Sequence, residues 1–279
     1  RLVALQRALT DSGYFEQVEV SPLREAARDG AIPVQVGLAD NERDRYRLGV
    51  GFGTDTGPRA SVGWQRRRVN RSGHGASADL QVSGRTTSLE GQYTIPLERP
   101  ASEELAFSLL TADESTDSRE SRSARLGVSR TQGRGEWRET LSIAYQRERF
   151  SLDGEPEEDA TLLLAGGGWS RGEADDPVFP ARGFKQAVEV QGAAAALLSD
   201  VSLVRAHATD RRVFSPWPRW RLLTRAELGA LWTEDLDRVP ASLRFYAGGD
   251  QSVRGYDYEA LGPRDDDGDV RGGRYLAVA

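Results

Sequence analysis

The sequence has 279 residues, with 37 Lys+Arg against 43 Asp+Glu and a net charge of -6 at pH 7, which argues against a nucleic acid as partner. The absence of cysteine excludes a disulfide framework, a cysteine zinc site and a thiol nucleophile. Hydrophobic residues make up 38%, and no apolar run approaches the roughly 20 residues that a membrane helix needs. A membrane β-barrel remains compatible with this composition, because its apolar residues occupy alternate positions along each strand.

The first 40 residues predict a helix followed by two short strands. Leu2, Leu5 and Leu9 share one helical face, and Gly13 is placed to end the helix. Strands are expected at 16–22 and 31–39. A unit of this size is too small to stand alone comfortably and resembles the second half of a small α/β domain. Because no signal peptide precedes it, we expect the chain to be a mature or trimmed fragment.

From Arg43 onward the apolar residues recur with a period of two. In the first strand Tyr46 to Phe52 place their apolar side chains on one face, and glycine and arginine occupy the other. Eleven candidate strands follow one another at about 43–53, 61–67, 73–85, 87–97, 104–112, 123–131, 136–150, 161–171, 183–197, 201–214 and 219–233.

The length of these strands favours a membrane β-barrel over a soluble sandwich. Soluble strands average about 5 or 6 residues, whereas a tilted membrane strand needs about 9 to 11. One face of each strand is apolar but light, and the other is polar. Short turns at 55–58 and 215–218 alternate with longer charged loops, expected at 113–122 and 151–159. The predicted fold is mainly β, a transmembrane antiparallel β-barrel; a large soluble all-β protein is the alternative.

The segment 244–256 interrupts this series of strands. Gly248, Gly249 and Gly255 permit backbone angles closed to other residues, which predicts a tightly folded loop. Arg254, flanked by Val253, Gly255 and Tyr256, suggests a charge held on a packed apolar tip; Asp250 lies in the same segment. The alternative is a surface turn with a solvated arginine.

The first strand of the barrel suggests a mechanism. Gly49, Gly51 and Gly53 offer few side chains to fix its register, so this strand is a candidate weak point in a closed sheet. Its unpaired backbone groups would then be a template for an incoming strand, since such groups cannot stay unpaired in lipid without cost. Alternatively, these glycines make room for bulky residues in the lumen.

Four stretches carry a resemblance to a known family. They are Gly13-Tyr14-Phe15, residues 46–58, residues 175–183, and 244–256 continuing through Leu261-Gly262-Pro263-Arg264. On these stretches the chain resembles the bacterial surface antigen family of outer-membrane assembly proteins, most closely its TamA branch (translocation and assembly module subunit).

The resemblance implies a 16-stranded barrel, of which about 11 or 12 strands fall within this chain, preceded by periplasmic POTRA domains. Residues 1–39 would be the C-terminal part of a POTRA domain, and 43–279 an incomplete barrel with an inward-folded loop at 236–270. Arg254 would contact the inner barrel wall and hold this loop. Since the chain stops at Ala279, inside the expected twelfth strand, part of that wall lies outside it.

The resemblance also implies a location and partners. We expect the bacterial outer membrane, with the N-terminal part in the periplasm, and a function in inserting or translocating autotransporter-type β-barrel clients. Its partners would be outer-membrane lipid and a TamB-like inner-membrane-anchored periplasmic protein. The alternative function is a passive pore or a two-partner-secretion-type translocation channel.

No residue pattern predicts an enzyme, a cofactor or a resident metal. His74 and His207 are the two histidines, and no serine has the surroundings of a hydrolase nucleophile. The acidic run 265–269 resembles a calcium loop, but aligning Gly268 on the loop glycine places Pro263 and Arg274 at ligand positions. We predict a solvated acidic loop there, with weak divalent-ion binding left open.

Overall fold

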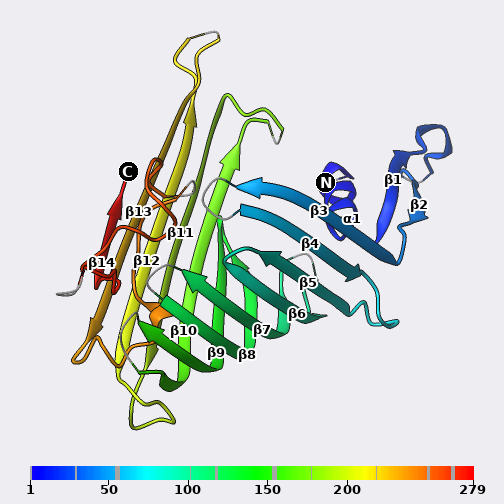
Figure 1. The fold of residues 1–279 in the computed structure, drawn as a ribbon. Coiled ribbons are helices and arrows are strands. Elements are labelled where there is room, and N and C mark those ends of the chain that lie inside the picture. The colour runs from blue at the N-terminus through cyan, green and yellow to red at the C-terminus, as the bar shows by residue number, and fades with distance from the viewer. Residues whose placement is uncertain are drawn as a thin grey trace.

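The computed structural model describes residues 2–28, 30–53, 57–100, 102–116, 119–152, 156–176, 178–217, 219–249, 252–264 and 268–279. These residues form two antiparallel sheets, one of two strands and one of 12 (Figure 1). Among them, no helix combines the length and the apolar character needed to cross a membrane.

The N-terminal unit contains α1 (Leu2–Asp11), β1 (Phe15–Pro22), the short 3-10 helix η1 (Arg24–Ala26) and β2 (Val34–Asp40). Gly13 follows the helix with φ +69°, a conformation suited to glycine. The predicted helix and two strands are therefore confirmed; their origin in a POTRA domain stays a prediction. Tyr14 joins this unit to the large sheet, because its hydroxyl donates a 2.7 Å hydrogen bond to the carbonyl of Gly73.

The 12 strands of the large sheet follow one another in chain order, each antiparallel to the next. The sheet curls into a partial barrel whose two edge strands, β3 and β14, are not paired with each other (Figure 1). The strands are β3 (Asp44–Gly53), β4 (Gly57–Arg66), β5 (Gly75–Ser83), β6 (Thr86–Pro96), β7 (Glu104–Thr116), β8 (Arg119–Arg134), β9 (Trp137–Leu152), β10 (Glu158–Ala174), β11 (Arg182–Ala193), β12 (Leu203–Phe214), β13 (Leu222–Thr233) and β14 (Tyr275–Val278).

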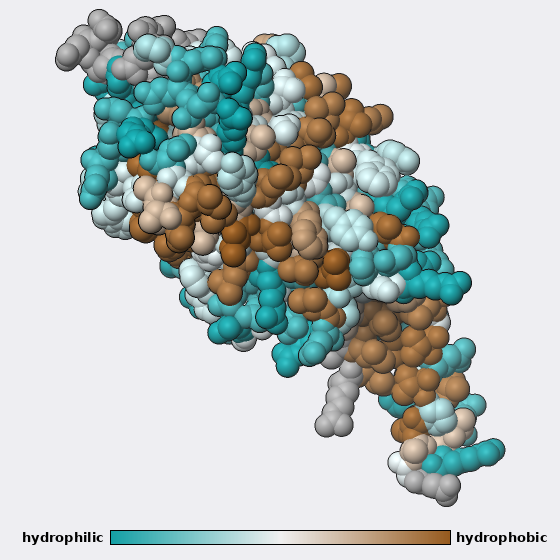
Figure 2. All heavy atoms as spheres, turned by 90° about the horizontal axis from the view of Figure 1, so that it is seen from below, coloured by the Kyte–Doolittle hydropathy of each residue, from teal (hydrophilic) through white to brown (hydrophobic). Residues whose placement is uncertain are grey.

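The two faces of this sheet differ as the alternation predicts. On the face here called outer, Leu48 and Val50 are 83% and 93% exposed. On the other, inner face, Leu162, Leu164 and Leu231 are buried against the chain segment that links β13 to β14. Apolar side chains gather in patches across the middle of the surface seen in Figure 2, between hydrophilic regions. The outer face is thus apolar without being covered by protein.

Two details of the expected turns are wrong. The stretch expected as a charged loop at 113–122 is mostly strand, because β7 and β8 continue to Thr116 and from Arg119, with Asp113 opposite Arg122. Charge did not end these strands, since oppositely charged side chains pair across them: Arg122 Nε donates to Asp113 Oδ2 over 2.9 Å. Gly57 and Pro58, expected in a turn, begin β4.

Candidate functional site

The candidate site is the long connection 234–274 between β13 and β14, here called the inner loop. It lies against the inner face of the sheet (Figure 1). Leu243 of its short 3-10 helix η2 (Ala241–Leu243) is buried together with Val239 and Phe245 in one apolar cluster with residues of β10, β12 and β13. Burial of these side chains is the apolar part of the loop's attachment.

A buried carboxylate fixes η2 to the inner face of the sheet. Glu148 of β9 is 0% exposed and accepts hydrogen bonds from Ser121 Oγ (2.9 Å) and Gln146 Nε2 (3.0 Å). It also accepts from the backbone N–H of Ser242 over 3.1 Å and from the Ser242 hydroxyl. These donors compensate the loss of water around the carboxylate, and two of them come from the loop itself.

Arg244 ties the two arms of the inner loop together. Its side chain is 3% exposed and donates to the carbonyls of Val239 (3.0 Å), Asp237 (2.7 Å) and Arg271 (3.0 Å). A guanidinium offers donors in a fixed planar arrangement, which suits three separate carbonyls. The arginine therefore closes the loop at its base.

Phe245 needs a glycine beneath it. A Cβ added to Gly229 of β13 would lie 2.6 and 2.8 Å from atoms of the Phe245 ring, which is closer than carbon atoms approach. Arg205 covers the other side of this ring, with its guanidinium carbon 4.4 Å from the ring centroid. Arg205 Nε also donates to the carbonyl of Leu243 over 3.1 Å. Apolar packing and hydrogen bonds thus act on the same turn of the loop.

A second buried ion cluster lies where the inner loop passes β7 and β8. The Arg119 guanidinium is 2.7 Å from Glu114 Oε2 and 2.9 Å from Glu259 Oε2, and it lies over the Tyr246 ring at 4.8 Å. Burial raises the pKa of Glu259, although Arg119 opposes this, and burial with the Glu259 charge raises the pKa of Tyr258 to about 12. The loop therefore carries a carboxylate into a poorly hydrated position beside an arginine.

The predicted motif residues lie at the tip of the inner loop. Gly248, Gly249 and Gly255 have φ of +115°, +93° and +89°, so all three use the conformation for which glycine was expected. A Cβ on Gly248 would collide with the carbonyl oxygen of Asp257. The N–H of Gly249 donates to the carbonyl of Tyr256 over 3.0 Å, which closes the tip.

Arg254 is exposed and makes no hydrogen bond or ion pair within the part of the chain that the structure describes. With Val253 it lines a hollow of about 890 Å³ that also touches β11, β12, β13 and the end of β14. Tyr256 is 55% exposed. Asp250 and the acidic residues 265–267 lie outside the described residues. The contact of Arg254 with the barrel wall stays a prediction; the tip shares this hollow with the end of β14, an edge strand of the sheet.

The predicted seam residues lie on β3, at one edge of the sheet. A Cβ on Gly49 would be 2.6 Å from Ser61 Oγ, and one on Gly51 would be 2.9 Å from Arg59 Nε. Side chains from β4 thus occupy the space over these two glycines, as the alternative interpretation expects. Gly53 is the last residue of β3. The weak-seam role itself stays a prediction.

Sequence reasoning missed the side chains that hold the loop. Glu148 was expected as a strand residue, Arg119 as part of the charged loop 113–122 and Arg244 as part of the motif, although all three are at most 4% exposed. Glu148 and Ser242 are 94 residues apart, so no local pattern joins them. A charged residue in the middle of a strand, facing a long glycine-rich loop, was the available signal. Within the described residues, no group of three acidic or histidine side chains could hold a metal ion.

Fold and site together define a curled antiparallel sheet with an apolar outer face and a loop folded against its polar inner face. Residues 70–279 match the model of the Omp85 superfamily domain. The chain belongs to the Omp85 superfamily.

The chain is also similar to two known proteins. The chain is 24% identical over 284 residues to the outer membrane protein assembly factor BamA of Neisseria meningitidis serogroup B (strain ATCC BAA-335 / MC58), an alignment that covers 90% of this chain and 35% of the relative. Its fold is similar to the crystal structure of BamA from Haemophilus ducreyi lacking POTRA domains 1-3, with a TM-score of 0.77 at 17% identity. That match covers 99% of this chain and 59% of the other, so the chain spans only part of the length of both proteins.

Proposed function

We propose that the chain is part of an outer-membrane protein assembly factor that helps insert β-barrel substrates into the outer membrane. Its large sheet would form most of a transmembrane β-barrel, with the apolar outer face in lipid and the inner loop in the lumen. The observation that carries this proposal is the combination of exposed apolar side chains outside with a buried, hydrogen-bonded loop inside. Superfamily membership and the BamA relative support it.

The finer proposal follows the resemblance to the TamA branch. It gives the protein autotransporter-type clients and a TamB-like periplasmic partner, and makes residues 1–39 the end of a periplasmic POTRA domain. We assign it no enzymatic activity and no cofactor. Comparing the insertion of autotransporter-type clients with that of other β-barrel clients, in cells depleted of the full-length protein, tests this choice. An equal loss of both classes would contradict the TamA-type role and leave the general one standing.

The mechanism we propose uses the edge of β3. In lipid, the backbone N–H and C=O groups of an edge strand have no water to bond, so a client strand that pairs with them lowers the free energy. A seam between β3 and a closing strand beyond Ala279 would be the place where such a strand enters. Gly49, Gly51 and Gly53 would keep this strand adaptable, because they add no side chains that fix its register.

A passive pore is the second candidate function, as is a two-partner-secretion-type translocation channel. The inner loop disfavours a permanently open pore, because it is attached to the wall by an apolar cluster, Glu148 and Arg205 rather than by a few surface contacts. Conductance of the full-length protein in planar bilayers separates the two. A large steady open state would favour the pore, and a closed state with brief openings would favour the assembly factor.

The role of the tip is tested by Arg254→Ala in the full-length protein. We expect impaired client assembly with the strand content unchanged, because Arg254 has no bonding partner among the described residues that its loss would disturb. Arg71→Ala, in the turn between β4 and β5, is the matched control for removing an exposed arginine. Normal client insertion by Arg254→Ala would count against the tip, while the general assembly function would remain testable by depletion.

A further inference from the structure

The outer face of β10, β11 and β12 changes character near the turn 175–181. Two rows of paired residues there are charged or polar at every position except Phe184: Glu173–Phe184–Arg212 and Arg171–Gln186–Asp210. The next row along the strands, Trp169–Val188–Ala208, is apolar. Successive rows on one face are about 7 Å apart. A polar band roughly two rows wide therefore borders the apolar surface that we place in lipid.

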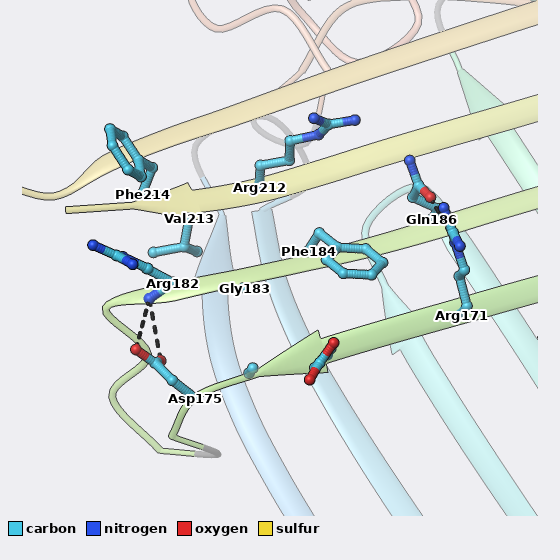
Figure 3. Close-up of a pocket in the computed structure, with 11 residues that line it drawn as sticks. Arg171, Asp175, Arg182, Gly183, Phe184, Gln186, Arg212, Val213 and Phe214 are labelled. Atoms are coloured by element: carbon cyan, nitrogen blue, oxygen red, sulfur yellow. Dashed lines mark hydrogen bonds between the residues drawn. The ribbon is translucent and has the colours of Figure 1, made fainter. Parts of the chain in front are cut away.

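A hollow of about 640 Å³ opens in this band, shown in Figure 3. Its volume lies in the range of small-molecule sites, about 300 to 1,000 Å³. The guanidinium-bearing residues Arg171, Arg182 and Arg212 line it together with the aromatic rings of Phe184 and Phe214. The carboxylates of Glu173 and Asp175 line it as well. The lining thus offers three guanidiniums, two carboxylates and apolar surface side by side.

A hydrogen-bonded chain across three strands orients two of these arginines. Arg171 Nε donates to Gln186 Oε1 (2.9 Å), as Figure 3 shows by the direction of the two side chains, and Gln186 Nε2 donates to Asp210 Oδ1 (2.7 Å). Arg212 donates to the same carboxylate through Nε, over 2.8 Å. The ring of Phe184 also lies 5.4 Å from the Arg171 guanidinium carbon. Arg212 also donates to Asp210 through Nη2 over 3.2 Å, and Arg171 Nη1 lies 3.7 Å from Glu136 Oε2. Each guanidinium keeps at least one further N–H group.

The third arginine is positioned by the turn. Asp175 accepts hydrogen bonds from the backbone N–H groups of Asp176, Ala181 and Arg182 at 3.0 to 3.1 Å. Figure 3 draws the two contacts that the Arg182 N–H makes with the two carboxylate oxygens. The Asp175 carboxylate is therefore occupied by the backbone. The Arg182 side chain makes no hydrogen bond or ion pair within the described ranges, and it lines the hollow.

Exposed aromatic side chains place the hollow at the depth of a bilayer interface. Phe179, Trp217 and Trp220, on the turns on either side of it, are 71%, 66% and 69% exposed. Arg221 lies over the Phe179 ring, with 4.3 Å between its guanidinium carbon and the ring centroid. Aromatic residues gather at the level of the lipid headgroups in membrane proteins, in β-barrels as in helical proteins. The phosphates of lipids lie at this level.

We propose that this hollow is a binding site for the phosphate of a glycerophospholipid in the leaflet next to the turn 175–181. Arg182 holds the phosphate through charge-assisted hydrogen bonds, for which the planar guanidinium is suited, and Arg212, whose guanidinium lies at the other end of the hollow in Figure 3, adds positive charge. Phe184 and Phe214 contact the glycerol and the first part of an acyl chain. The proposal depends on the barrel lying in a membrane and does not depend on the assembly function.

The test measures lipid retained by the full-length protein in detergent. Protein is supplied with phosphatidylglycerol, diacylglycerol or inorganic phosphate, washed, and analysed by native mass spectrometry. We expect one retained phosphatidylglycerol, little diacylglycerol and no phosphate. The double variant Arg182→Gln/Arg212→Gln should lower phosphatidylglycerol retention roughly tenfold, as the loss of charge-assisted bonds to an anion implies. Arg211→Gln is the matched control, because Arg211 is the neighbour of Arg212 on the opposite, inner face.

Each result decides the proposal. Equal phosphatidylglycerol retention by wild type and double variant, or equal retention of diacylglycerol by the wild type, would overturn it in favour of unspecific lipid contact. Binding of inorganic phosphate as tight as that of the lipid would overturn the choice of a lipid as ligand. If the double variant fails to fold, Arg182→Gln alone serves, since that side chain has no bonding partner among the described residues, and it should lower retention while Arg211→Gln does not.

Discussion

The attachment of the inner loop through Glu148 gives a prediction whose size follows from the contacts. Glu148→Ala removes the acceptor of two donors of the loop, the Ser242 N–H and the Ser242 hydroxyl. A hydrogen bond to an ionised group contributes about 1.5–3 kcal/mol. Two such bonds give about 3–6 kcal/mol, and the lower figure already corresponds to more than a hundredfold change, roughly, in the population of undocked loop.

The assay is hydrogen exchange at the backbone amide of Ser242 in the full-length protein. We expect exchange at least about tenfold faster in Glu148→Ala than in the wild type, with the amides of the neighbouring strands β8 and β9 protected as before. Glu120→Gln is the matched control, because Glu120 is an exposed carboxylate on β8. Unchanged exchange at Ser242 in Glu148→Ala would refute the claim that this carboxylate holds the loop.

Two further predictions concern the same loop. Gly229→Ala should displace Phe245 and weaken the attachment of the loop by about 1–3 kcal/mol, because the added Cβ would overlap the ring. Faster proteolysis within 240–260 would show this. Proteolysis of the variant as slow as that of the wild type would contradict it. The second prediction concerns Glu259, which faces Arg119, Glu114 and the tyrosines 246 and 258. Burial raises the pKa of Glu259, although the positive charge of Arg119 opposes this. The contribution of Glu259 to docking is therefore present at low pH and is lost as the pH rises through the raised pKa. Exchange at the Ala260 amide should therefore quicken as the pH rises from 4.5 to 8, and Glu259→Gln should remove this dependence; exchange independent of pH after correction for its intrinsic rate would contradict it.

The strands were predictable because each has one apolar face, and the alternation is visible over nine residues or more. The strand ends were less predictable. Between Asp113 and Arg122 the composition is that of a solvated loop, yet these residues pair with each other across the hairpin, so the strands continue. Composition describes a residue's preference for water, whereas the partner across the strand decides whether the ladder of hydrogen bonds continues.

The candidate site was predictable where it depends on the backbone. Glycines at 248, 249 and 255 mark positive φ without reference to any distant residue. Which arginine is buried did not follow from the sequence: Arg244 and Arg254 stand in similar aromatic and glycine-rich surroundings, yet Arg244 is enclosed and Arg254 is exposed. The difference arises because the carbonyls that Arg244 needs come from both ends of the loop, and their meeting depends on how the loop folds.

The contacts of β3 change the argument for a seam. If its glycines acted by leaving empty space, the strand would be poorly packed, but Ser61 and Arg59 occupy the space over Gly49 and Gly51. Empty space over these two glycines is therefore not an argument for a seam at β3. The argument for a seam then depends on the edge of β3. Along this edge the backbone groups have no partner among the described residues. The apolar side chains of Leu48 and Val50 are exposed rather than packed against a protein neighbour. In lipid this edge attracts any strand whose apolar side chains match in alternation, because only pairing satisfies the backbone there. A seam at β3 would thus depend on how well the closing strand competes for this edge, and not on weakness within β3 itself.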